Sequence, residues 1–179
     1  TLSLTPVANA LFKESFKIEK LTDGRVTPSI GILLDLWGLR RGQTPQIPDT
    51  ADIIKAQKSL LIKHFSLLAP NKIIIHKTIR PIFGAFTEGF ALDFARKVLE
   101  KNNIQDYLVE IGGDFIWKGK NPKKEAWTIA LTDPHNKTTP LGVLKLNDFK
   151  GQGGALSTSG NYQQFFTDSL TGKKFHHII

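Results

Sequence analysis

Two adjacent histidines near the end of the chain, His176 and His177, could perform acid–base chemistry near neutral pH. Successive side chains of a β-strand point to opposite faces, so these two imidazoles are not expected to bind one metal ion together. Either histidine could act as a general base if it faced a cleft. The alternative is structural, with one ring buried and hydrogen-bonded and the other in solvent, and the pair alone favours this alternative.

A short polar turn, Ser157-Thr158-Ser159-Gly160, lies upstream of the two histidines. Small hydroxyl residues followed by glycine could supply a nucleophile, a nest of N–H groups for a phosphate, or the cap of a strand. A catalytic serine needs a base within hydrogen-bond reach, and His177 is a candidate for that base. The sequence leaves these three readings open.

A glycine-flanked segment, residues 84–93, is a candidate phosphate site. It is predicted to form a tight turn from Gly84 into a helix over residues 88–101, with Thr87 as the N-cap. The free N–H groups and the positive dipole at such a helix end suit a phosphate. The alternative is a tight strand-to-helix connection that happens to use glycine, and the local sequence favours this alternative.

A second glycine pair, Gly112-Gly113, precedes Asp114 and indicates a β-bulge or a close approach by another backbone or a ligand. Asp114 could serve as a metal ligand or a base, but a solvated aspartate beside a bulge is favoured. Further upstream, residues 24–31 form a loop that leads into an apolar helix ending Leu36-Trp37-Gly38. This loop could line a cofactor pocket with Trp37 packed against it, although a core position is the more common outcome for tryptophan.

Composition restricts the classes of protein that fit. The 179 residues are 40% hydrophobic and 22% charged, as in one soluble globular domain. The absence of cysteine excludes a disulfide framework, a thiol nucleophile and a thiolate metal site. No apolar run is long enough to span a membrane. The net charge of +8 favours anionic partners, but the lysines are dispersed, which disfavours nucleic acid.

Hydrophobic periodicity predicts an α+β fold with a mostly antiparallel sheet and packed helices. The predicted helices cover residues 6–21, 29–39, 50–62 and 88–101. The predicted strands cover residues 71–78, 107–111, 114–119, 126–132, 141–146, 155–158, 162–166 and 173–179.

Taken in order, these segments resemble the ApbE family of flavin transferases over about residues 5 to 179. The resemblance rests on the Gly-rich turn before Leu36-Trp37-Gly38, the segment 84–93, Gly112-Gly113-Asp114, the Trp127 strand ending Asp133-Pro134, Thr158-Ser159-Gly160, and His177-Ile178-Ile179. The chain departs from the family at Ile82-Phe83, where an aspartate is usual.

The resemblance implies a single ApbE-like, T-fold-like domain over residues 1–179, lacking the family's N-terminal segment and its C-terminal metal-binding segment. It implies FAD contacts from Arg25, Val26, Thr27, Glu88 and Ile179. It also implies a Mg²⁺ ligand from the Ala85 backbone carbonyl and assistance from His177 in deprotonating the acceptor hydroxyl.

The implied activity is Mg²⁺-dependent transfer of FMN from FAD onto a Thr or Ser of a target flavoprotein, with release of AMP. An FAD pyrophosphatase that yields FMN and AMP, or an FAD-binding module without chemistry, is the alternative. The expected partners are FAD and an acceptor flavoprotein, with no nucleic acid. The expected location is the periplasm, or the extracytoplasmic face of a membrane through a lipoprotein anchor upstream of Thr1.

Overall fold

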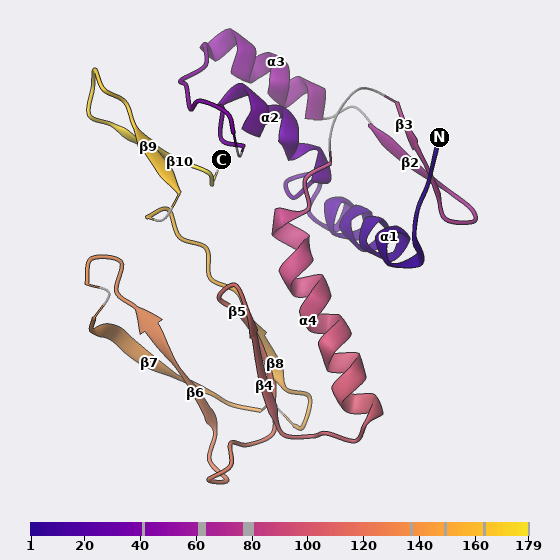
Figure 1. Ribbon diagram of the computed structural model, residues 1–179, viewed down its shortest axis with the longest axis vertical. Helices are drawn as coiled ribbons and strands as arrows, with labels where there is room; N and C mark the ends of the chain where they lie inside the picture. Colours follow the sequence, from indigo (N-terminus) through magenta and orange to yellow (C-terminus); the bar gives the residue numbers. More distant parts are fainter. Residues whose placement is uncertain are drawn as a thin grey trace. The chain divides into compact units, whose positions relative to one another are not determined.

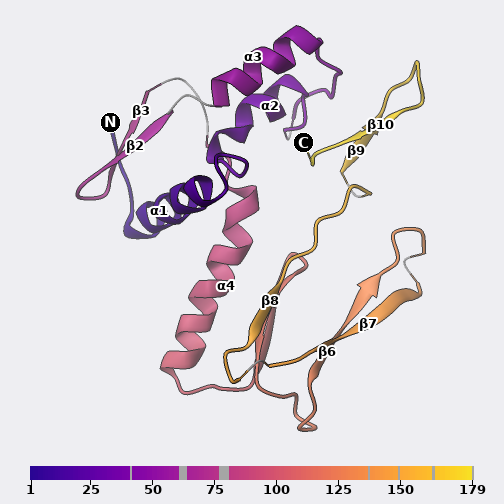
Figure 2. The same ribbon diagram turned by 180° about the vertical axis from the view of Figure 1, so that it is seen from behind.

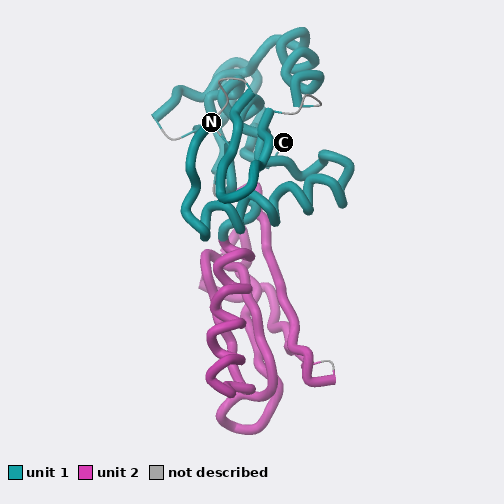
Figure 3. Tube along the Cα trace, turned by 90° about the vertical axis from the view of Figure 1, so that its right-hand side faces the viewer, with its two compact units in different colours: residues 1–87, 163–179 teal, residues 88–162 magenta. Residues whose placement is uncertain are grey.

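The computed structural model describes residues 1–40, 42–60, 64–76, 81–136, 138–148, 150–162 and 164–178, and Figures 1 and 2 show it from opposite sides. The chain divides into two compact units (Figure 3). Unit 1 comprises Thr1–Thr87 and Gln163–Ile179, and unit 2 comprises Glu88–Tyr162. No helix in the described part of the chain is long and apolar enough to cross a membrane.

Unit 1 contains a helix packed on a small antiparallel sheet. Helix α1 (Pro6–Leu21) begins where the Thr5 hydroxyl accepts a hydrogen bond from Ala8 N at 3.2 Å, with proline at the first helical position. The sheet has the order β1-β3-β2. Its strands are β1 (Leu2–Ser3), β2 (Phe65–Leu68) and β3 (Lys72–Ile75). Phe12 of α1 and Phe65 and Ile73 of the sheet form the buried centre.

The rest of unit 1 consists of helices and one hairpin. A 3₁₀ turn, η1 (Pro28–Ile30), runs into α2 (Gly31–Leu36), and α3 (Thr50–Leu60) follows. The hairpin pairs β9 (Phe165–Thr167) with β10 (Lys174–His176). Helix α2 ends at Leu36 and is capped by Gly38, whose N–H donates to Asp35 O while Leu39 N donates to Leu34 O. This pair of bonds is the Schellman motif, which requires a left-handed residue at the position that glycine occupies.

Unit 2 has three layers (Figure 2). Helix α4 (Gly84–Lys101), which enters this unit at Glu88, packs on a sheet of order β4-β5-β8. The strands of this sheet are β4 (Tyr107–Ile111), β5 (Asp114–Lys118) and β8 (Gly154–Leu156). The pair β6 (Trp127–Thr132) and β7 (Pro140–Leu146) covers the other face of the sheet.

Alternation along the strands of unit 2 explains the three layers. Tyr107 and Ile116 pack with Leu92 of α4. Their neighbours Leu108 and Trp117 pack toward the β6–β7 pair. Because successive strand side chains point to opposite faces, one sheet contributes to both cores.

The carboxylate of Asp148 ties two loops of unit 2 together. Its Oδ1 accepts from Gly153 N at 2.7 Å and its Oδ2 accepts from Gly119 N at 2.8 Å. These two hydrogen bonds hold the pKa of Asp148 below its ordinary value. A depressed pKa stabilises the fold at pH values above the unfolded pKa of about 3.9, and this stabilisation is lost as the pH falls through the folded pKa.

We therefore expect Asp148→Asn to lower the melting temperature at pH 7 and to reduce the loss of stability on acidification below about pH 4. Thermal melts followed by circular dichroism between pH 2.5 and 7 measure both effects. Asp93→Asn, at an exposed position on α4, is the control. Equal pH slopes for Asp148→Asn and the wild type would contradict the expectation.

The α+β class predicted from the sequence is confirmed, but strands β1 and β2 and the start of helix α4 differ from the prediction. Strands β1 and β2 were not predicted, and residues 77 and 78 of the predicted strand 71–78 lie outside the described residues. Helix α4 begins at Gly84, so the prediction of a start at Glu88 was wrong. Thr87 is not an N-cap, because its hydroxyl donates back to Phe83 O at 3.1 Å. The Phe83 carbonyl also accepts from Phe86 N and Thr87 N, so it accepts the first bonds of the helix.

The glycine pair of unit 2 also differs from its prediction. Gly112 and Gly113 form the two-residue turn of the β4–β5 hairpin, in which Ile111 pairs with Asp114, rather than a β-bulge. Both glycines have positive φ, +63° and +95°, as a type I′ turn requires. The strand pattern on both sides of the pair is therefore continuous.

Candidate functional site

The loop Arg25–Thr27 leaves α1 in a fixed conformation. Arg25 N donates to Thr22 O at 3.0 Å and Val26 N donates to the Thr22 hydroxyl at 3.1 Å. Thr27 is buried, and its hydroxyl accepts from Ser29 N at 3.0 Å and donates to the Glu19 carboxylate. Since that hydroxyl is already fully used, Thr27 holds the loop in place, while the exposed Arg25 offers a cationic side chain to an anionic ligand.

Helix α2 connects this loop to an aromatic stack. The Trp37 ring lies 5.3 Å from the ring of Phe175 on β10, measured between centroids. Phe175 in turn stacks on Phe166 of β9, its partner in the strand pairing, at 5.4 Å. Trp37 is only half-buried, where the sequence favoured a core position, and its ring contacts the strand that leads to His177.

His177 lies directly after β10 and is half-buried. Its ring Nδ1 is 3.3 Å from the backbone oxygen of Gln164, and its backbone N–H donates to the same oxygen at 3.4 Å. Because a carbonyl oxygen can only accept, Nδ1 donates in this contact, and in the neutral ring Nε2 is then the nitrogen with the lone pair. His177 is thus arranged as a base that acts through Nε2.

One end of unit 2 gathers the other candidate residues. The Ser157 hydroxyl, which follows β8, donates to Asp114 Oδ1 at 2.7 Å. The turn at Gly112 lies beside the Glu88 side chain, whose Cγ would be 3.7 Å from a Cβ added at that glycine. Asp114 is half-buried and Ser157 is exposed. The Ser157 hydroxyl is therefore hydrogen-bonded to the carboxylate of Asp114.

The order of these groups along the chain matches a known family. The sequence model of the ApbE family matches residues 2–179. The chain belongs to the ApbE family. Both units fall within the match.

The chain is similar to curated relatives that are named FAD:protein FMN transferase. The FAD:protein FMN transferase of Escherichia coli K12 is 29% identical over 187 residues, which cover 100% of this chain and 52% of the relative. The enzyme of the same name from Buchnera aphidicola is 33% identical and covers 92% of this chain and 48% of its own length. The chain therefore spans about half the length of the curated relatives it matches.

Solved structures support the ApbE fold. The ApbE protein of Thermotoga maritima aligns with a TM-score of 0.80 and 27% identity, over 99% of this chain and 56% of that structure. The flavin transferase ApbE of Vibrio cholerae aligns with a TM-score of 0.69 and 23% identity, over 96% of this chain and 53% of that structure.

A Mg²⁺ site of the ApbE type is not assembled from the described residues. Ala85 is exposed in the first turn of α4, and a helical carbonyl at that position points along the helix toward the N–H four residues on. Mg²⁺ prefers an octahedral shell of oxygen ligands. Across the described ranges, no group of three or more His, Asp or Glu residues could hold a metal ion. Ala85 alone does not make a metal site, and Ile179 lies outside the described residues.

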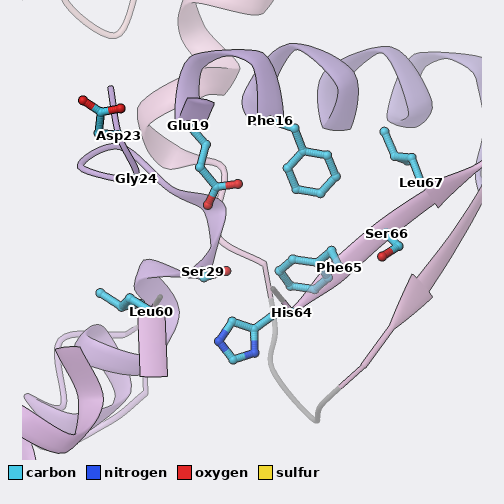
Figure 4. Close-up of a pocket in the computed structure, with 10 residues that line it drawn as sticks. All are labelled: Phe16, Glu19, Asp23, Gly24, Ser29, Leu60, His64, Phe65, Ser66 and Leu67. Atoms are coloured by element: carbon cyan, nitrogen blue, oxygen red, sulfur yellow. The ribbon is translucent and has the colours of Figure 1, made fainter. Parts of the chain in front are cut away.

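A cavity of about 630 Å³ opens in unit 1 between α1 and β2 (Figure 4). Its walls include the aromatic rings of Phe16 and Phe65 and the carboxylates of Glu19 and Asp23. An acidic lining does not suit the pyrophosphate of FAD. Because the Glu19 carboxylate accepts a hydrogen bond from the Thr27 hydroxyl, this wall supports the neighbouring loop.

The sequence singled out His177 but missed the residues that hold it. Gln164 and Phe166 were placed in a predicted strand without a role, and Phe175 was not distinguished from its neighbours. One signal was available, since Phe175 and His177 are two positions apart and therefore share one face of a strand. The hydrogen bond from His177 to the Gln164 carbonyl has no sequence signature.

Proposed function

We propose that this protein transfers FMN from FAD to a threonine or serine hydroxyl of an acceptor protein and releases AMP. Membership of the ApbE family over residues 2–179 supports the reaction class, and relatives from several bacteria are named FAD:protein FMN transferase. The orientation of His177, with Nδ1 bound to Gln164 O, is the observation that carries the proposal. A base whose Nε2 lone pair is available is what deprotonation of an acceptor hydroxyl needs.

The proposed chemistry is a phosphoryl-type transfer. The acceptor oxygen forms a bond to the phosphorus of the FMN moiety, and the bond from that phosphorus to the bridging oxygen breaks, so that AMP leaves with that oxygen. The hydroxyl proton passes to His177 Nε2. The positive charge of exposed Arg25 suits binding of the pyrophosphate, since such transfers depend mainly on positioning and charge stabilisation.

Mg²⁺ dependence and location are further parts of the proposal. The family resemblance supports a requirement for Mg²⁺, with the Ala85 carbonyl as one ligand. It also supports a periplasmic location or an extracytoplasmic membrane anchor. Removal of Mg²⁺ by a chelator is expected to stop the transfer, and readdition of Mg²⁺ is expected to restore it.

Intact-mass spectrometry tests the proposal. A flavoprotein domain with a Thr/Ser flavinylation site is incubated with the protein, FAD and Mg²⁺, and AMP is assayed alongside. We expect the acceptor to gain the mass of one FMN and AMP to accumulate in equal amount. An acceptor whose Thr/Ser is replaced by alanine is the control and should stay unmodified.

Two other outcomes would support the alternatives. AMP without a modified acceptor would identify an FAD pyrophosphatase, in which water replaces the hydroxyl. Tight FAD binding with neither product would identify an FAD-binding module. The second alternative draws support from the incomplete metal-ligand set among the described residues.

A further inference from the structure

We infer that Trp37 is a positioning residue for the base of the transfer, because its indole packs on Phe175 of β10, the strand that leads directly into His177. This inference rests on the proposed function for its catalytic meaning. The contact itself, between the end of α2 and strand β10, lies within unit 1.

The aromatic stack connects Trp37 to the backbone of His177. Trp37 meets Phe175 at 5.3 Å with their planes inclined by 38°, and Phe175 stacks on Phe166 at 5.4 Å with an angle of 20°. Such offset and tilted arrangements are the favoured geometries of aromatic pairs. Among the aromatic contacts of the described residues, Trp37–Phe175 is the one that joins this hairpin to a helix.

The strand register relates the stack to the base. Phe175 pairs with Phe166 and His176 pairs with Phe165. The pairing continues one position further, where His177 N donates to Gln164 O at 3.4 Å. His177 lies at a bend directly after β10, two positions beyond Phe175, and its backbone is still bound to Gln164, which directly precedes β9. Displacement of Phe175 would move His177 relative to Gln164 and weaken the 3.3 Å contact that fixes its tautomer.

Trp37 itself is held by backbone bonds on both sides. Its N–H donates to Leu33 O at 3.0 Å, and its carbonyl accepts from Gln46 N at 3.1 Å. The next residue is Gly38, which closes the helix in a left-handed conformation. These bonds fix the backbone from which the indole reaches Phe175.

A double-mutant cycle tests the inference. Because a small displacement of a reacting group can cost up to roughly 10²-fold, Trp37→Ala should lower kcat of FMN transfer by roughly 10- to 100-fold and change KM for FAD by less than about 3-fold. In a His177→Ala background, Trp37→Ala should have no further effect on kcat. Trp37→Phe should restore most of the rate, because it keeps an aromatic ring against Phe175.

Phe16→Ala provides the matched control. Phe16 is a partly buried aromatic residue of unit 1 that packs in the α1 core and not on the hairpin. It should lower stability and should change kcat by the same factor with or without His177. If Trp37→Ala behaved like Phe16→Ala in the cycle, with equal losses in both backgrounds, Trp37 would be a merely structural residue and the inference would be overturned.

A measurement independent of transfer separates this inference from the proposed function. Long-range ¹H–¹⁵N NMR spectra of the wild type should show the His177 proton on Nδ1, and Trp37→Ala should shift the ring toward a mixture of tautomers. Trp37→Phe should keep the Nδ1–H form. An unchanged tautomer in Trp37→Ala overturns the positioning role. Absence of FMN transfer in the wild type would instead overturn the proposed function. The NMR spectra would then still show whether the Trp37–Phe175 contact fixes the tautomer of His177.

Discussion

His177→Ala is expected to lower the rate of FMN transfer by about 10²- to 10⁴-fold, which is the usual contribution of a general base. The imidazole is held by Gln164 O through Nδ1, so its removal takes away the acceptor for the hydroxyl proton at Nε2. Binding of FAD is expected to change little, since the lost group acts on the acceptor and not on the dinucleotide. The measurement is the time course of FMN-modified acceptor by intact mass, together with an FAD titration.

His176→Ala is the informative control for this prediction. His176 is the last residue of β10 and takes no part in the contact between His177 and Gln164 O, so its loss should leave the transfer rate within a few-fold. His177→Asn, which keeps a polar side chain but no base, should be as slow as His177→Ala. Transfer by His177→Ala at near the wild-type rate would show that another group, or water, takes the proton.

The parts of the fold that the sequence predicted are those with local signals. Helix α1 matches residues 6–21 because a capping threonine, a proline and an amphipathic repeat all indicate the same start and face. Strands β4 and β5 match the predicted strands 107–111 and 114–119 closely, although the glycine pair between them was predicted as a β-bulge and is a hairpin turn. In these segments, local preference and the final packing agree.

The parts that were missed depend on contacts between distant residues. Strand β2 follows a helix closely and is only four residues long, so its identity comes from pairing with β3 and burying Phe65 against Phe12. The start of α4 was misassigned because Thr87 has the residue type of an N-cap, whereas the Phe83 carbonyl accepts the first helical hydrogen bonds. A sequence pattern gives the residue types but does not predict which backbone carbonyl accepts the first hydrogen bond of a helix.

The candidate site shows the same limit. Family motifs indicated His177, but the tautomer of its ring depends on Gln164, and its support depends on Trp37. The sequence placed the motif Leu36-Trp37-Gly38 in the family pattern and predicted that Trp37 packs against a cofactor pocket or in the core. In the structure, the glycine of that motif closes α2 and the tryptophan contacts the strand of the base, so the motif and the base belong to one packed group.

Gly38→Ala, which adds one methyl group beside Trp37, is expected to destabilise the fold strongly. Gly38 has a φ of +63°, and a Cβ there would lie 2.1 Å from Thr44 O and 2.8 Å from Thr44 C. The left-handed conformation alone costs a non-glycine residue about 1–2 kcal/mol. The backbone at Thr44 must also move. This movement weakens the hydrogen bond from Gln46 N to Trp37 O and the two hydrogen bonds of the Schellman motif, each worth about 1 kcal/mol. We expect a loss of about 3–5 kcal/mol in the free energy of unfolding.

Gly24→Ala separates the steric effect from the conformational one. Gly24 also has a positive φ, +75°, but a Cβ at that residue would meet nothing within 4 Å. It should therefore lose only about 1–2 kcal/mol. Denaturant unfolding of the two variants, followed by circular dichroism, measures the difference. Equal losses of stability would mean that the backbone at Thr44 moves at little cost in free energy. A backbone that moves so readily could not hold Trp37 against the strand that leads to His177.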